Sequence, residues 1–399
     1  MPVNGSQMER RRAYTGPAIW SWGFRPFFFG AGAWACAALA IWLAAFYGLI
    51  EPPIGRDAAS WHAHEMIFGF AVAAVAGFLL TAVPNWTSRL PVMGAPLALL
   101  FGAWLAGRLA TLTAGWTGLG PAMAVDVAFL LLLSAVIARE VVSGRNWRNL
   151  PVSVVLVLLA VANALDHLAA LEILADRALG QRLALALVAV LIALIGGRIV
   201  PSFTRNWLKR RGAANLPAEH GLIDRFGIAV VALAAAAWAF RPDHAATGGL
   251  MLLAGTATLM RLARWQGWAT GPEALVWVLH LGYAWLGVGL CLLGASILWA
   301  DVPYFAAVHA LTAGAVGTMT LAVMTRATLG HTGRELIAGP ATTAVYGLVT
   351  LAAILRVASG FADPDGILLP ASGVAWMAAF GLFVVAYAPL WLRPRPSAS

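Results

Sequence analysis

Long apolar stretches separated by short polar connections run through the whole chain of 399 residues. About 20 consecutive apolar residues suffice for one helical crossing of a bilayer. By that measure the pattern predicts twelve transmembrane helices, at residues 26–50, 61–83, 93–114, 121–142, 150–172, 180–200, 222–241, 247–264, 272–299, 303–326, 338–359 and 368–391. The connections leave no room for a soluble domain, so we expect one all-α transmembrane domain over residues 1–399.

Composition points to the same class of protein. Hydrophobic residues make up 61% of the chain and charged residues only 11%, which is too little polar surface for a soluble globule of this length. Both cysteines, Cys36 and Cys291, lie inside apolar stretches and are expected to be small core residues.

The net charge of +9 is best explained by membrane topology rather than by a nucleic-acid partner. Most basic residues, including Arg10, Arg11 and Arg12, fall at the helix ends that face the cytoplasm if the N-terminus lies there. We therefore expect both termini on the cytoplasmic side and the lipid bilayer as the surrounding partner.

Three of the predicted helices end in weakly similar sequences. They are TAVPNWTSR (81–89), GRIVPSFTRNW (197–207) and LAVMTRATLGH (321–331), at the ends of the second, sixth and tenth spans. A period of four helices predicts three related units, at residues 20–142, 147–264 and 272–391.

The second span opens with histidines, and ionisable groups in an apolar span indicate function by default. His62 and His64 are two residues apart, about 200° around a helix, so they must serve different partners. His62 shares its face with Gly69 and Gly77, which would leave room for a flat macrocycle, so it is a candidate haem ligand. A hydrogen-bonded pair of interfacial histidines is the alternative. His64 could hold a second metal, since copper accepts imidazole readily.

Further candidates lie in other spans. His309 enters the tenth span at a depth similar to that of His62 in the second, so the two could sandwich one haem, although alone His309 would more often be structural. His280 and Tyr283 lie one helical turn apart on one face. They could form a metal ligand with its support, a proton relay or a simple interhelical hydrogen bond. His331 follows at the predicted cytoplasmic end of the tenth span.

Arg108 and Asp126 lie toward the outer side of the third and fourth spans. They are expected first of all to form an ion pair. Arg108 could instead anchor a haem propionate.

Several stretches together resemble the NnrS family. They are FRPFF (24–28), WHAHEMIFGF (61–70), AGFLLTAVPNWT (76–87), GGRIVPSFTRNWL (196–208), HLGYAW (280–285) and HALTAGAVGTMTLAVMTRATLGHTGR (309–334). The resemblance implies a bacterial inner-membrane protein of twelve helices, associated with haem, copper and the response to nitric oxide.

A fainter resemblance links the second span to the catalytic subunit of haem-copper oxidases. His62, Met66 and Phe68, followed by Asn85 and Trp86, are similar to the second helix of that subunit, where the histidine at the position of His62 binds a low-spin haem. This chain departs from the oxidases because its sixth and seventh spans contain no histidine. Any copper site would therefore have to be built differently.

These observations together predict an oxidoreductase of nitric oxide metabolism that reduces nitric oxide to nitrous oxide. We expect a b-type haem on His62 and His309, with copper on some of His64, His280 and His331. Glu65 or Tyr283 would handle protons, and a quinol or a cytochrome would donate electrons. The alternatives are a haem protein that binds nitric oxide without turnover and, with less support, a secondary transporter.

Overall fold

The computed structural model describes residues 14–394, and within that range every regular element is a helix. Twelve helical segments are long and apolar enough to cross a membrane, which confirms the predicted fold class and makes the chain a multi-pass membrane protein. They are Phe24–Phe46, Ala58–Thr87, Ala95–Leu112, Leu119–Ser143, Trp147–Ala170, Leu179–Arg210, Leu222–Phe240, Ala245–Ala263, Ala274–Leu298, Tyr304–His331, Pro340–Phe361 and Leu368–Leu392. The orientation remains a prediction, and Arg10, Arg11 and Arg12, on which it partly rests, lie outside the described residues.

The sixth and tenth spans are longer than their apolar stretches. They continue to Arg210 and His331, past the predicted ends at residues 200 and 326. Helical hydrogen bonding does not depend on apolar side chains, so a helix can continue into the polar interface after its apolar segment has ended.

The chain divides into two compact units. Within the described residues, unit 1 comprises residues 14–184, 327–334 and 384–394, and unit 2 comprises residues 185–326 and 335–383. Unit 1 contains η1 (Ala18–Ser21), α2 (Phe24–Phe46), α3 (Ala58–His64), η2 (Glu65–Ala71), α4 (Val72–Thr87), α5 (Ala95–Leu112), α6 (Ala114–Thr117), α7 (Leu119–Ser143), η3 (Trp147–Asn149) and α8 (Leu150–Ala170). The three-repeat organisation stays a prediction.

Unit 2 contains the remaining short and long helices, and the unit boundaries fall inside three of them. Those three are α9 (Leu179–Leu191), α15 (Thr318–His331) and α17 (Leu368–Leu392). The others are η4 (Ile192–Gly196), α10 (Gly197–Arg210), α11 (Leu222–Phe240), α12 (Ala245–Ala263), η5 (Gly267–Thr270), α13 (Ala274–Leu298), α14 (Tyr304–His309), η6 (Ala310–Gly317) and α16 (Pro340–Phe361).

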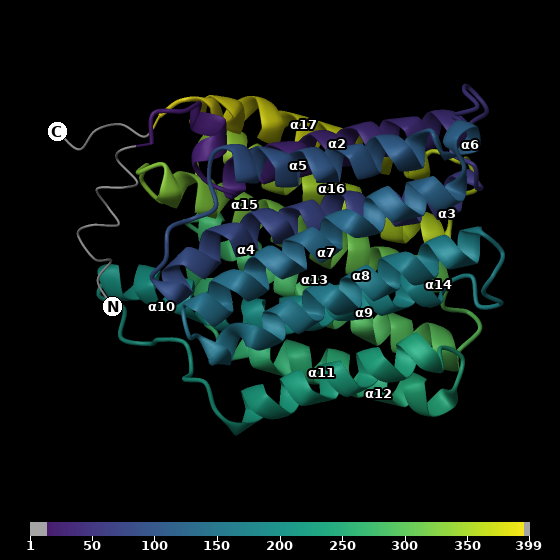
Figure 1. Ribbon diagram of the computed structural model, residues 1–399. Helices are drawn as coiled ribbons and strands as arrows, with labels where there is room; N and C mark the ends of the chain where they lie inside the picture. The colour runs from purple at the N-terminus through teal and green to yellow at the C-terminus, as the bar shows by residue number, and fades with distance from the viewer. Residues whose placement is uncertain (1–13, 395–399) are drawn as a thin grey trace. The chain divides into compact units, whose positions relative to one another are not determined.

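Within unit 1, α7 packs against α4, α5 and α8, and α4 packs in turn against α2 (Figure 1). In the N-terminal half of the second span, α3 and η2 also pack against α2, and η2 contacts α5. Phe24, Phe27 and Phe28 of α2 are fully buried and form part of the apolar core.

The second, sixth and tenth spans each contain a π-helical segment, at η2, η4 and η6 respectively. A π segment adds a residue to the turn, shifts the faces that follow it, and occurs often at functional sites. In the second span it begins at Glu65, directly after the two histidines.

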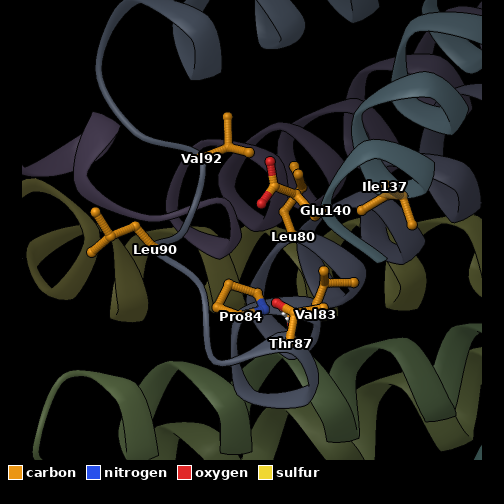
Figure 2. A pocket seen from close by; sticks show the side chains of 8 residues that line it. All are labelled: Leu80, Val83, Pro84, Thr87, Leu90, Val92, Ile137 and Glu140. Atoms are coloured by element: carbon orange, nitrogen blue, oxygen red, sulfur yellow. Dashed lines mark hydrogen bonds between the residues drawn. The ribbon is translucent and has the colours of Figure 1, made fainter. Parts of the chain in front are cut away.

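The other end of the second span holds a small cavity (Figure 2). Pro84 lies inside α4, and the helix ends at Ser88, which has a left-handed φ of 54°. The cavity, about 10 Å³, is lined by apolar side chains around Pro84 and by Glu140. That volume admits about one water molecule, so this is not a cofactor pocket.

Candidate metal centre

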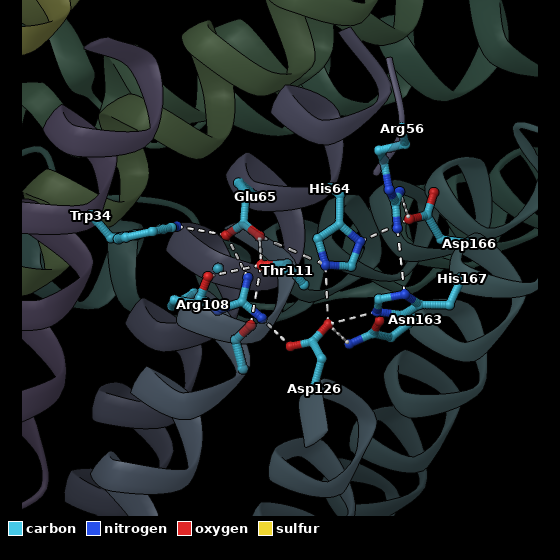
Figure 3. Close-up of polar contacts among 12 residues, drawn as sticks. Trp34, Arg56, His64, Glu65, Arg108, Thr111, Asp126, Asn163, Asp166 and His167 are labelled. Atoms are coloured by element: carbon cyan, nitrogen blue, oxygen red, sulfur yellow. Dashed lines mark hydrogen bonds and ion pairs between the residues drawn. The ribbon is translucent and has the colours of Figure 1, made fainter. Parts of the chain in front are cut away.

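His64 lies at the centre of a buried polar network in unit 1 (Figure 3). Its side chain is fully buried, with Nδ1 2.7 Å from Asp166 Oδ2 and Nε2 3.0 Å from Asp126 Oδ2. The ring is thus held at both nitrogens by carboxylates from two other spans.

Helix α8 contributes three polar residues to this network. Asp166 and His167 follow Asn163 by three and four residues, which places all three on one face of the helix. His167 Nε2 lies 3.1 Å from Asp126 Oδ2, and Asn163 Nδ2 donates to the same oxygen at 2.9 Å. Asp126 Oδ2 is therefore the point on which both histidines converge.

The three side chains His64, Asp126 and His167 have the arrangement of a metal-binding group. Their ligand atoms all lie within 4.8 Å of one another, and all three residues are buried. Metal–nitrogen and metal–oxygen bonds of about 2.0–2.2 Å place neighbouring ligand atoms roughly 3 Å apart, close to the two histidine–carboxylate separations found here. Two imidazoles and one carboxylate suit copper, iron or zinc. Asp166, on the second nitrogen of His64, is the outer support that metal-bound histidines usually have.

Arg108 joins the metal-type group to Glu65. Its side chain is fully buried, and it donates to Glu65 Oε2 at 2.6 Å and to Asp126 Oδ1. The expected ion pair between Arg108 and Asp126 is present. Trp34 Nε1 and Thr111 Oγ1 also donate to Glu65, at 2.7 and 2.6 Å, and Glu65 Oε1 lies 4.0 Å from His64 Nε2.

Two further residues, Arg56 before α3 and Gln181 of α9, donate hydrogen bonds to the network. Arg56 Nη1 donates to Asp166 Oδ2 at 2.8 Å, and its Nη2 lies 3.4 Å from His167 Nδ1. Gln181 Nε2 donates to Asp166 Oδ1 at 2.9 Å. Apart from the histidines, the network thus contains three carboxylates and two guanidinium groups.

Two glycines allow the charged groups to approach each other. A Cβ atom on Gly69 would lie 2.6 Å from Glu65 Oε2 and 2.6 Å from Trp34 Nε1, and one on Gly107 would lie 2.8 Å from Asp126 Oδ1. Protein side chains fill the space beside Gly69, which was expected to leave room for a macrocycle.

His62 has a different environment from His64, as their spacing predicted. Its ring stacks on Trp42 of α2, with centroids 4.3 Å apart and planes inclined by 24°. His331, also in unit 1, packs against Trp22 with ring centroids 4.7 Å apart. Neither residue belongs to the metal-type group.

The other predicted site residues lie in unit 2. His280 Nε2 is 2.8 Å from Thr204 Oγ1, whereas the Tyr283 hydroxyl accepts a hydrogen bond from Arg261 at 2.6 Å. His309 Nδ1 is 2.7 Å from the carbonyl oxygen of Phe305. The three residues therefore have three separate sets of partners, and their roles as ligands or catalytic groups stay predictions.

The structure adds residues to the site that were not selected from the sequence. These are Arg56, Asn163, Asp166 and His167. Asp126 was selected as an ion-pair partner of Arg108, and the structure adds it as a candidate metal ligand. The signal that could have found most of them is the sequence Asn163-x-x-Asp166-His167 within an apolar span, because such polar groups are expensive to bury without a purpose.

The fold and the site define a class of protein, an all-helical multi-pass membrane protein with a buried histidine–carboxylate group suited to a metal ion. The chain matches the family model described as NnrS protein over residues 18–395, and it belongs to the NnrS family. This makes it a membrane protein of a nitric oxide-related family. No curated protein sequence matches the chain.

Proposed function

We propose that this protein acts on nitric oxide at a transition metal held by His64, Asp126 and His167. The observation that carries the proposal is the convergence of three buried ligand atoms from three spans. Copper is the metal that the family resemblance favours, and two imidazoles with a carboxylate suit it.

The surrounding residues prepare this group for a metal. The Asp166 carboxylate accepts a hydrogen bond from Nδ1 of His64, so the ring proton lies on Nδ1. Nε2 is then the nitrogen that can bind the metal. Arg108 pairs with both Glu65 and Asp126, so neither carboxylate is buried without a cationic partner. Three protein ligands would leave a coordination position open, as catalytic sites do. The bound metal would supply a place for nitric oxide to bind and an electron to pass.

The finer reaction we propose is the reduction of two nitric oxide molecules, with two electrons and two protons, to one nitrous oxide and one water. A quinol or cytochrome would donate electrons, and Glu65 or Tyr283 would handle protons. A b-type haem on His62 or His309 would supply the second centre. The Nδ1 contact of His309 with a backbone carbonyl supports ligation through Nε2, because such a bond fixes the tautomer.

Arg108 already donates to two carboxylates, so its contacts favour the ion pair over a haem propionate. We place the protein in the bacterial inner membrane, with both termini in the cytoplasm.

Metal analysis of the purified protein tests the central claim. We expect stoichiometric metal in the wild type, with loss in Asp126→Asn and His167→Gln. His220→Gln, which changes an exposed histidine, should keep the metal. Equal metal content in all four proteins would refute the site.

Two further measurements separate the finer proposals. A haem absorption band that changes in His62→Ala or His309→Ala would support those ligands, and no haem band after expression with ample haem would remove them. Consumption of nitric oxide with a chemical reductant would distinguish an enzyme from a protein that only binds the gas.

A further inference from the structure

Arg56 occupies an unusual position for a residue next to a metal-binding group. It lies outside the spans, just before the Asp57 cap of α3, yet its side chain is only 6% exposed. Its guanidinium group contacts both Asp166, which supports one proposed ligand, and His167, which is another.

The hydrogen-bond roles at His167 conflict with metal binding. An arginine side chain can only donate, so His167 Nδ1 accepts from Arg56 and the ring proton lies on Nε2, where it faces Asp126. A metal needs a bare Nε2. The ring proton would then lie on Nδ1 and point at the N–H groups of Arg56, so two donors would face each other.

The charges lead to the same conclusion. In the metal-bound site both histidines are neutral, and Glu65, Asp126 and Asp166 against Arg56 and Arg108 leave one net negative charge. The divalent cation turns this into one net positive charge in a buried site. Withdrawal of Arg56 would restore neutrality, and buried charge is costly unless it is compensated.

We propose that Arg56 competes with a divalent metal ion for the site and leaves His167 when the metal binds. This inference rests on the proposed metal site. The backbone before Arg56 is fixed, because Gly115 N donates to the Pro53 carbonyl at 2.7 Å, so the side chain moves rather than the loop. The state of the buried site is thereby transmitted to a side chain that belongs to the segment just outside the second span.

Titration of the purified full-length protein with Co²⁺, followed by the visible absorption of the ion, tests the competition. Arg56→Gln removes the charge and should bind Co²⁺ about tenfold more tightly than the wild type, the order expected for one charge beside a partly screened cation. Arg56→Lys keeps the charge and should stay close to the wild type. Arg177→Gln is the matched control, because it removes an exposed arginine that pairs with Glu172 in a neighbouring loop, and it should leave the affinity unchanged.

A second readout follows Arg56 directly. Modification of arginines by phenylglyoxal, quantified by mass spectrometry, should become faster at Arg56 when Co²⁺ is present and should not change at Arg177. Unchanged or weaker Co²⁺ binding in Arg56→Gln, or unchanged reactivity of Arg56, would overturn the competition while leaving the metal site intact. Absence of any Co²⁺ signal in the wild type would overturn the metal site and the competition with it.

Discussion

Arg108 is the residue whose removal the structure predicts to be most costly. Its side chain is fully buried, and it pairs with two carboxylates, Glu65 and Asp126, that are fully buried as well. Arg108→Gln would leave both anions without a cation. Breaking a buried ion pair from one side costs about 3–5 kcal/mol, because the remaining charge stays uncompensated. Thr111, Trp34 and Asn163 still donate to these carboxylates, so we expect about this loss in the free energy of unfolding rather than twice it.

A surface arginine provides the control for the same substitution. Arg139 pairs with Glu140 at 2.8 Å, but its side chain is 64% exposed, so Arg139→Gln should cost at most about 1 kcal/mol. Unfolding of both variants by SDS in mixed micelles gives the two free energies. A third variant tests the cause, because Arg108→Gln should cost less when Glu65→Gln has already removed one of the anions. Equal costs for Arg108→Gln and Arg139→Gln would refute the claim that burial makes the loss of Arg108 more costly than the loss of an exposed arginine.

Three further predictions concern separate parts of the molecule. Gly69→Ala should destabilise the protein by about 1–3 kcal/mol, since the new Cβ would meet Glu65 and Trp34, whereas Gly102→Ala, with nothing within 4 Å, should be neutral or stabilising in the same SDS titration. Tyr283→Phe should cost about 0.5–1.5 kcal/mol, because buried Arg261 loses one acceptor but keeps Asp224 and the Ala193 carbonyl; normal stability with lost nitric oxide turnover would instead indicate a catalytic hydroxyl. The hydrogen bond from Arg182 lowers the pKa of Asp176, so this pair stabilises the fold at neutral pH and its contribution disappears as the pH falls below about 4. Half-exposed Asp176 limits that contribution to about 1 kcal/mol, measured as the difference between wild type and Asp176→Asn at pH 7 and at pH 3.

The twelve spans could be predicted from the sequence because the bilayer imposes a length and a polarity on each of them. The ends of the helices could not, as the continuation of α10 through Pro201 to Arg210 illustrates. The predicted sixth span stops at residue 200, where the apolar stretch ends, yet α10 contains Pro201 and the polar side chains that follow it.

The site was predictable only in part, for a geometrical reason. The separate partners of His62 and His64 followed from helical periodicity, since both lie in one helix whose angles are fixed. The partners of His64 come from α7 and α8, and no local pattern states which face of one span meets another. The π segment at Glu65 adds to the difficulty, because it shifts the faces that regular periodicity would assign.

A comparison of the buried ion pairs in the two units suggests which of them is linked to chemistry. In unit 1 the arginine is Arg108 of α5 and the acid is Asp126 of α7, and the pair bonds to Glu65, the first residue of a π segment. In unit 2 the order is reversed, because Asp224 lies on α11 and Arg261 on α12, 3.2 Å from Nε to Oδ1.

Arg261 also lies 3.4 Å from the carbonyl oxygen of Ala193, within the π segment of the sixth span. Each arginine therefore contacts a π segment, Arg261 through a backbone carbonyl oxygen and Arg108 through the side chain of Glu65. A structural role explains both pairs. Among residues 14–394, however, the one metal-type group of histidines and acids lies beside the pair in unit 1. A structural role common to both ion pairs does not explain the histidines next to Asp126. These histidines are therefore the residues that link the unit 1 pair to metal binding.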